Sequence, residues 1–121
     1  MTQPLALIIE DDPKLADIFA LSLETAGYQV EIIADGGAAL TRLAEMAPDV
    51  VVLDLHLAHV SGEGILHYIR ANIHLTKVHV ILATADAAMA DQLGEQVDLV
   101  LLKPISPFQL RDLATRLRLA L

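Results

Sequence analysis

The stretch VVVLDLH at residues 50–56 indicates the fold class of this chain. It belongs to an apolar run, Val50–Leu55, that only Asp54 interrupts, and so continuous a run is typical of a strand with two buried faces. Such strands belong to parallel sheets that helices cover on both sides. Three more runs share this composition, and a fourth with polar neighbours is expected at a sheet edge: Leu5–Ile9, Val78–Thr84, Leu99–Leu102 and, at the edge, Val30–Ala34.

Helical patterns fill the segments between these strands. In the first, Asp12 is expected to cap the helix, Ile18 and Phe19 belong to its buried face, and Gly27 ends it. The fourth helix is mostly alanine and is expected to be short and loosely held. Five alternating strand–helix units predict a doubly wound α/β fold of three layers. The later helices are expected at Gly36–Ala47, Gly62–Ala71, Asp86–Glu95 and from Ser106–Pro107 onward.

Composition favours one globular domain and excludes several classes of protein. The chain has 121 residues, of which 55% are hydrophobic, so we expect a single domain over residues 1–121. Cysteine is absent, which excludes disulfides and thiolate metal sites. The formal net charge of −8 repels nucleic-acid phosphates, so direct binding to nucleic acid is not expected. No apolar run is long enough for a membrane span and the first residues do not resemble a signal peptide, so the cytoplasm is the expected location.

The residues that follow the predicted strands carry most of the reactive groups. These residues are Glu10 and Asp11 after the first strand, Asp54 near the end of the third, Thr84 at the end of the fourth and Lys103 after the fifth. In a sheet with the strand order 2-1-3-4-5, these ends lie at one edge, where doubly wound folds bind their ligands. Clustered carboxylates repel one another, and a hard divalent cation such as Mg²⁺ relieves the repulsion. With an ammonium and a hydroxyl beside them, these groups predict a phosphoryl-transfer site.

Four short motifs at the ends of the predicted strands carry a resemblance to a known family. The motifs are Glu10-Asp11-Asp12-Pro13, Asp54-Leu55-His56-Leu57 with Gly62 downstream, Thr84-Ala85 and Lys103-Pro104. The order and spacing of these motifs resemble those of the receiver domains of bacterial two-component response regulators, including chemotaxis regulators. Receiver domains of this family have a flavodoxin-like (βα)5 fold. The resemblance implies a phosphorelay switch in which Asp54 takes a phosphoryl group from the phosphohistidine of a sensor histidine kinase or phosphotransfer protein. An effector domain or output protein is the implied target, and no enzyme activity is implied beyond self-phosphorylation and autodephosphorylation.

The resemblance also implies a set of metal ligands. Asp11 would bind Mg²⁺ directly, and Glu10 would act mainly through water. Asp54 and the backbone carbonyl of His56 would complete the protein ligands. No organic cofactor is implied.

Two further residues match the switching groups of the family, and other positions depart from its pattern. Thr84 matches a hydroxyl that moves toward the phosphoryl group, and Lys103 matches a lysine that pairs with it; the Lys103–Pro104 bond is often cis in the family. Val100 stands where an aromatic residue is frequent, Ala58 stands where proline is frequent, and only 19 positions separate Thr84 from Lys103. We therefore expect phosphorylation to be retained, and the readout through the fourth helix and fifth strand to be unusual.

Two alternative functions are a receiver-like module that binds a partner without phosphorylation and a small flavodoxin-like enzyme. The second is disfavoured because the chain carries acids where a flavin site needs a Ser/Thr-rich loop. The five histidines lack the spacing of a metal site and are expected at the surface, but His56 is expected to tune phosphorylation together with Asp86. The arginines of the last helix fit a solvated face or a docking surface for an acidic partner: Arg111, Arg116 and Arg118.

Overall fold

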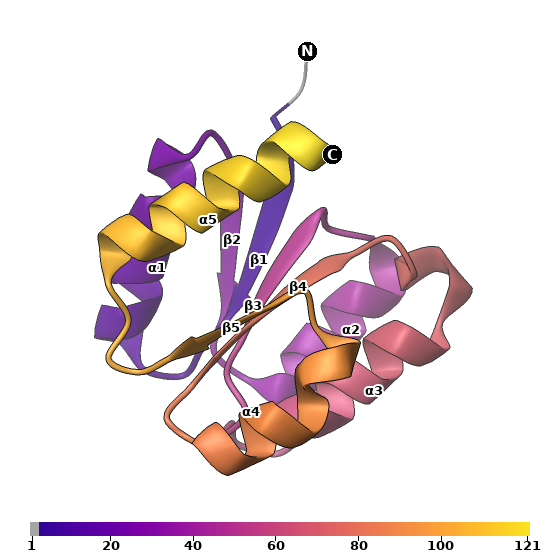
Figure 1. The fold of residues 1–121 in the computed structure, drawn as a ribbon. Helices are drawn as coiled ribbons and strands as arrows, with labels where there is room; N and C mark the ends of the chain where they lie inside the picture. The colour runs from indigo at the N-terminus through magenta and orange to yellow at the C-terminus, as the bar shows by residue number, and fades with distance from the viewer. Residues whose placement is uncertain (1–2) are drawn as a thin grey trace.

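A computed structural model describes residues 3–121 and shows one parallel sheet between two layers of helices (Figure 1). The strands lie in the order β2-β1-β3-β4-β5, as predicted. Their bounds are β1 Leu5–Ile9, β2 Gln29–Ile33, β3 Val50–Leu53, β4 His79–Thr84 and β5 Leu99–Leu102. The three-layer, doubly wound α/β fold is therefore confirmed.

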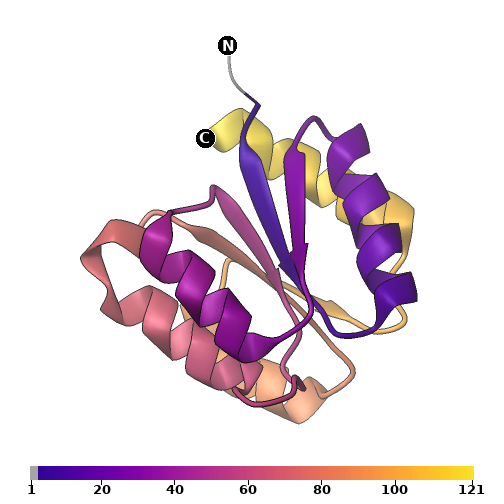
Figure 2. The same cartoon turned by 180° about the vertical axis from the view of Figure 1, so that it is seen from behind.

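Five helices cover the sheet, α1 and α5 on one face and α2, α3 and α4 on the other (Figures 1 and 2). Their bounds are α1 Pro13–Thr25, α2 Gly36–Glu45, α3 Gly62–Ala71, α4 Ala87–Leu93 and α5 Pro107–Ala120. Two short 3₁₀ turns, Ile73–Leu75 and Gly94–Gln96, follow α3 and α4. Within residues 3–121, no helix has the length and hydropathy that crossing a membrane requires.

The central strands divide the apolar core into two halves. Alternate residues of a strand point to opposite faces, so each of these strands contributes to both halves. Ile8 and Val52 pack toward α1 and α5, while Ile9 and Leu53 pack toward α2, α3 and α4. All four side chains are buried. This burial on both faces explains why β1, β3 and the central residues of β4, 80–83, are continuously apolar.

The two edge strands differ from the central ones. β2 has exposed and half-buried positions, which confirms its predicted place at an edge. The prediction that the run at 99–102 is buried on both faces is wrong, because Val100 is 37% exposed and Leu102 is 50% exposed. β5 is the other edge, and its neighbour α4 has only seven residues, too few to cover this end of the sheet.

The first helix begins and ends where its sequence signals predict. The Asp12 carboxylate accepts hydrogen bonds from the N–H groups of Lys14 and Leu15. At the other end, Gly27 has a φ of 100°, a left-handed conformation in which glycine lacks the steric penalty of other residues. Ile18, however, is exposed, although the periodicity places it on the buried face.

The other boundaries lie close to the predicted ones. α2 ends at Glu45 and not at Ala47, and the fourth helix is confined to Ala87–Leu93. β3 ends at Leu53, so Asp54 lies just beyond the strand and not within it.

Candidate functional site

The register of the sheet brings the ends of four strands to one edge. Ile9 pairs with Leu53, and Leu53 pairs with Leu82 on the next strand. Thr84 pairs with Leu102 on β5. The residues after these positions therefore lie side by side along the carboxyl edge of the sheet, although up to 93 positions separate them in the sequence.

Three carboxylates meet at this edge. Glu10, Asp11 and Asp54 each place a carboxylate oxygen within 4.8 Å of the other two. Asp11 is exposed, whereas Glu10 is only 2% exposed and Asp54 only 5%. An all-oxygen cluster of this kind suits Mg²⁺, which prefers carboxylate, carbonyl and water oxygens. The three side-chain metal ligands predicted from the sequence are thus brought together.

Lys103 supplies the positive charge of the cluster. Its Nζ lies 2.8 Å from Oε1 of Glu10 and 3.7 Å from Oδ1 of Asp54. Its backbone N–H donates to the carbonyl of Thr84, which ties the residue after β5 to the end of β4. The Lys103–Pro104 peptide bond is cis, as the family resemblance implies. The sequence predicted a lysine that pairs with a phosphoryl group, but its bond to Glu10 was not predicted.

Burial makes the Glu10 carboxyl sensitive to nearby charge. Burial raises the pKa of Glu10 above its ordinary value. Hydrogen bonds from Lys103 Nζ and from the backbone N–H of Asp12 oppose this rise, and the charge of Asp54 adds to it. The pKa of Glu10 is raised in net, because burial outweighs the hydrogen bonds that oppose it.

The loop after β4 connects the buried hydroxyl of Thr84 to the loop after β3. Thr84 is fully buried, and its Oγ1 accepts a hydrogen bond from the backbone N–H of Asp86 at 3.0 Å. The Asp86 carboxylate caps α4 through the N–H of Met89 and lies 3.4 Å from Nε2 of His56. Asp86 and His56 thus lie next to each other, and their tuning of phosphorylation stays a prediction. The role of the His56 carbonyl as a metal ligand stays a prediction.

Gly62, the first residue of α3, lies directly against the backbone of the candidate nucleophile. A Cβ at this position would approach the carbonyl oxygen of Asp54 to 2.1 Å and the Cα of Leu55 to 2.6 Å, so only glycine fits. The N–H of Gly62 donates to the carbonyl of Leu55 at 2.9 Å. In the sequence, Gly62 stands out only because its distance from Asp54 along the chain matches the family motif. The close approach of α3 to the Asp54 backbone is seen only in the structure.

The other histidines take no part in this cluster. His59 contacts Asp35, His79 contacts Asp98, and His74 bonds to the carbonyl of Leu43. Among residues 3–121, the only group of three or more acidic or histidine side chains with metal-binding spacing is the carboxylate cluster.

Comparison with known sequences identifies the family. The family model described as response regulator receiver domain matches residues 6–115. The DNA-binding response regulator MtrA of Mycolicibacterium smegmatis is 32% identical over 115 residues, which are 93% of this chain and 48% of that protein. This chain therefore spans about half the length of the curated relatives it matches. Because these relatives are named as DNA-binding proteins, the absence of direct nucleic-acid binding remains only a prediction for this chain.

Solved structures share the fold along nearly the whole chain. The receiver domain of sensor histidine kinase PA1611 from Pseudomonas aeruginosa, with a magnesium ion coordinated in its active site cleft, is 26% identical. That match has a TM-score of 0.85 and covers 97% of this chain and 98% of the other. The chemotaxis response regulator CheY4 of Vibrio cholerae, 24% identical, has a TM-score of 0.86 over 96% of this chain and 99% of its own. By its strand-end motifs, its fold and its relatives, this chain belongs to the response regulator receiver domains of two-component systems.

Proposed function

We propose that this domain is a phosphoacceptor switch in which the Asp54 carboxylate takes a phosphoryl group from a phosphohistidine on a sensor histidine kinase or phosphotransfer protein. The observation that carries the proposal is the burial of Asp54 within a cluster that contains Glu10, Asp11 and the Lys103 ammonium. A carboxylate held beside further acids and one ammonium is arranged to receive an anionic group together with a cation.

In the proposed step, a carboxylate oxygen of Asp54 attacks phosphorus while the P–N bond of the phosphohistidine breaks. The imidazole keeps the electron pair of that bond and takes up a proton, and Asp54 becomes an acyl phosphate. Lys103, now 3.7 Å from Asp54, is placed to neutralise charge on the transferred group. Glu10, Asp11 and Asp54, with the His56 carbonyl, would hold Mg²⁺, which would neutralise charge on the phosphoryl oxygens.

The proposed switch acts through the loop after β4. Before transfer, the Thr84 hydroxyl is engaged with the N–H of Asp86. In that bond Thr84 Oγ1 is the acceptor, so its hydroxyl hydrogen could be donated to a phosphoryl oxygen on Asp54, a charge-assisted hydrogen bond that would draw Thr84 toward the transferred group. Because Asp86 also caps α4, a shift of this loop would be transmitted to α4.

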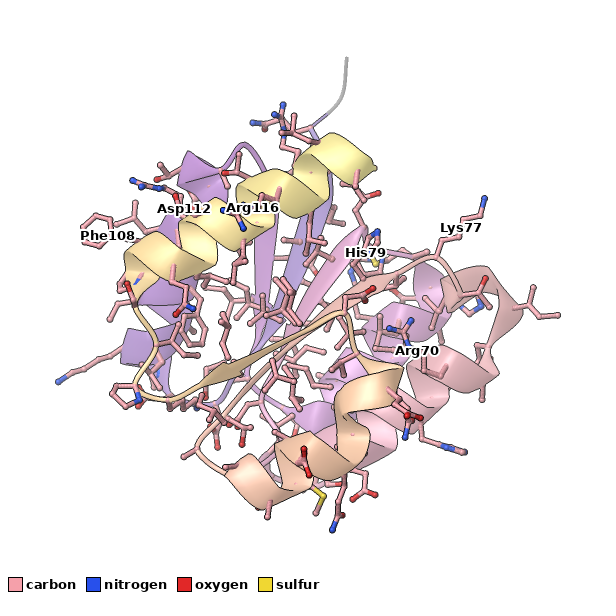
Figure 3. The ribbon with its side chains drawn as sticks, viewed as in Figure 1. Arg70, Lys77, His79, Phe108, Asp112 and Arg116 are labelled. Atoms are coloured by element: carbon pink, nitrogen blue, oxygen red, sulfur yellow. The ribbon has the colours of Figure 1, made fainter. Side chains whose placement is uncertain are left out.

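An exposed apolar patch near the site is the proposed contact surface for the phosphodonor protein. α1 and α5 both begin at the carboxyl edge, and they border a groove of about 300 Å³ lined by Ile18, Leu21 and Phe108. The ring of Phe108 projects outward from the start of α5 (Figure 3). Leu21→Glu should therefore slow transfer from any phosphohistidine protein that labels the wild type. Labelling by acetyl phosphate, which needs no docking surface, should not change.

The readout is proposed to differ from the common pattern of the family. Val100 has no ring to move inward, and α4 leaves Val100 and Leu102 exposed beside a shallow groove of about 280 Å³. The effector domain or output protein would therefore contact a short α4 and an open strand edge. A phosphorylated-state structure in which a longer α4 covers β5 would contradict this second part of the proposal.

The experiment that tests the proposal is labelling of the purified domain with acetyl phosphate and Mg²⁺. Asp54→Asn should abolish the label. Asp12→Asn is a matched control, because Asp12 lies at the same edge but caps α1, and asparagine caps equally well. Label that persists at an equal level in Asp54→Asn would overturn the assignment. Failure of the wild type to take up label or to bind Mg²⁺ would favour a module that binds its partner without phosphorylation.

A further inference from the structure

The loop between β3 and α3 carries the predicted ligand His56 and contains no proline. Its sequence over residues 55–61 is LHLAHVS. Within the loop, the N–H of Val60 donates to the carbonyl of Ala58, and the N–H of Gly62 closes the loop onto the carbonyl of Leu55. The His56 peptide itself is held by its N–H, which donates to Oδ1 of Asp54 at 3.3 Å. The rest of the loop, residues 57–61, is held in addition on its outer side, away from Asp54.

The first turn of α2 holds that outer side. The carbonyl oxygen of Val60 would lie 2.3 Å from a Cβ on Gly36, so the loop is seated directly on the helix. Next to this contact, Nδ1 of His59 lies 2.5 Å from Oδ1 of Asp35. The other oxygen of Asp35 accepts from the N–H of Ala38 and caps α2. One carboxylate thus fixes the start of α2 and binds the loop to it.

His59 has the backbone conformation of a residue held in place by its surroundings. Its φ is 69°, and it is the only residue other than glycine with a positive φ among residues 3–121. Residues with a Cβ disfavour this left-handed region and persist there only where the surrounding structure determines it. The contact with Asp35 is one such determinant, because it joins the side chain at the turning point of the loop to a rigid helix end.

We propose that His59 is a positioning residue that, through Asp35, clasps the β3–α3 loop to α2 and so sets the place of the His56 peptide beside Asp54. The inference rests on the proposed function, since it concerns the cation site that includes the His56 carbonyl. His59 touches neither the cation nor the phosphoryl group, and it acts by limiting the loop to one conformation.

The test compares three substitutions in the full chain. His59→Gly removes the contact and also relieves the left-handed backbone. His59→Asn keeps a donor near the place of Nδ1 and tolerates a positive φ. His79→Gly is the matched control, because His79 makes the same kind of contact, to Asp98 at 3.2 Å, at the opposite end of β4 from the site (Figure 3).

Two readouts separate positioning from stability. The first is the dissociation constant for Mg²⁺ alone, from amide NMR shifts at Asp11 and Asp54. The second is amide hydrogen exchange of residues 56–60 in the metal-free protein. His59→Gly should weaken Mg²⁺ binding about threefold, because an exposed pair of this kind contributes little energy, and it should speed amide exchange in the loop. His59→Asn should restore both, and His79→Gly should change neither.

If His59→Gly binds Mg²⁺ as tightly as the wild type and its loop amides exchange at the same rate, the proposed role of His59 is wrong. It is also wrong if His79→Gly weakens Mg²⁺ binding as much as His59→Gly does. If the wild type itself binds no Mg²⁺, the proposed function fails. The exchange readout still decides the clasp in that case, because equal exchange rates in the wild type and His59→Gly exclude it.

Discussion

Gly62→Ala should damage both the stability and the phosphorylation of this domain, because the added methyl group has no room. The Cβ would lie 2.1 Å from the carbonyl oxygen of Asp54, and real contacts of this kind stay beyond 3.0 Å. The backbone must therefore move by about 0.9 Å, the difference between these two distances. Overpacking of this kind typically costs about 1–3 kcal/mol, and we expect about 3 kcal/mol because the obstacle is backbone.

The displaced group is the peptide of the proposed nucleophile. A misplacement of about 1 Å is enough to lower a rate about 100-fold, so acetyl phosphate should label Gly62→Ala about 100-fold more slowly than the wild type. For a domain of this length, a loss of about 3 kcal/mol lowers the Tm by about 12 °C. Thermal unfolding and the initial rate of labelling therefore both report the change.

The same helix offers the control. A Cβ on Gly64 would meet only Val60 Cγ1 at 3.4 Å and Ser61 Oγ at 3.5 Å, which are ordinary contacts. Gly64→Ala should therefore leave labelling unchanged and raise stability by about 0.5 kcal/mol, since alanine is the better helix former. Equal Tm values and equal labelling rates in the two variants would refute the argument that α3 must approach the Asp54 peptide this closely.

Three further predictions concern single contacts. Tyr28→Phe removes the hydrogen bond from the buried hydroxyl to the carbonyl of Ala114, so urea unfolding near neutral pH should show a loss of about 1 kcal/mol. Burial raises the pKa of Tyr28 to about 12, so between pH 10 and about 12 only the unfolded chain loses the tyrosine proton. The stability of the wild type should therefore fall over this pH range, and an equal fall in Tyr28→Phe would contradict this. Burial alone would raise the pKa of Asp98, but hydrogen bonds from the Val80 N–H and His79 hold it below its ordinary value, so stability should fall as the pH drops below about 4. The pKa of Asp35 is also lowered, so Asp98→Asn should show a smaller fall, and a fall equal to that of the wild type would contradict this. Lys103→Met leaves buried Glu10 without its ammonium, so Mg²⁺ should raise the Tm more in this variant than in the wild type, and an equal rise would exclude competition between lysine and cation.

Much of the site was predictable because the reactive side chains of this fold lie where the strands end. Asp54 interrupts an apolar run, and Glu10, Thr84 and Lys103 stand at the ends of other runs. A parallel sheet brings such ends to one edge, so their convergence follows from the strand order alone. The hydrogen bond between Lys103 and Glu10 could not be predicted from the strand order. Whether Lys103 bonds to Glu10 or to Asp54 depends on the length and direction of the side chains at that edge.

Contacts between loops were not predictable. The pair formed by His59 and Asp35 joins residues 24 positions apart, and neither lies in a pattern that marks it. The exposure of Val100 also escaped prediction, since an apolar run does not reveal whether a helix covers it. Its exposure follows from a fourth helix too short to reach across β5.

By itself, the sequence determined the fold class and the identity of the acidic and basic groups at the sheet edge. The fold class and these groups follow from hydrophobic periodicity and from polar residues that end apolar runs, which are local properties of the chain, whereas the strand order was assumed and agrees with the family resemblance. The tertiary structure decided which of those groups touch, how closely α3 approaches Asp54 and how the β3–α3 loop is held to α2. These depend on the packing of elements remote in sequence, where differences of less than 1 Å determine whether a side chain fits.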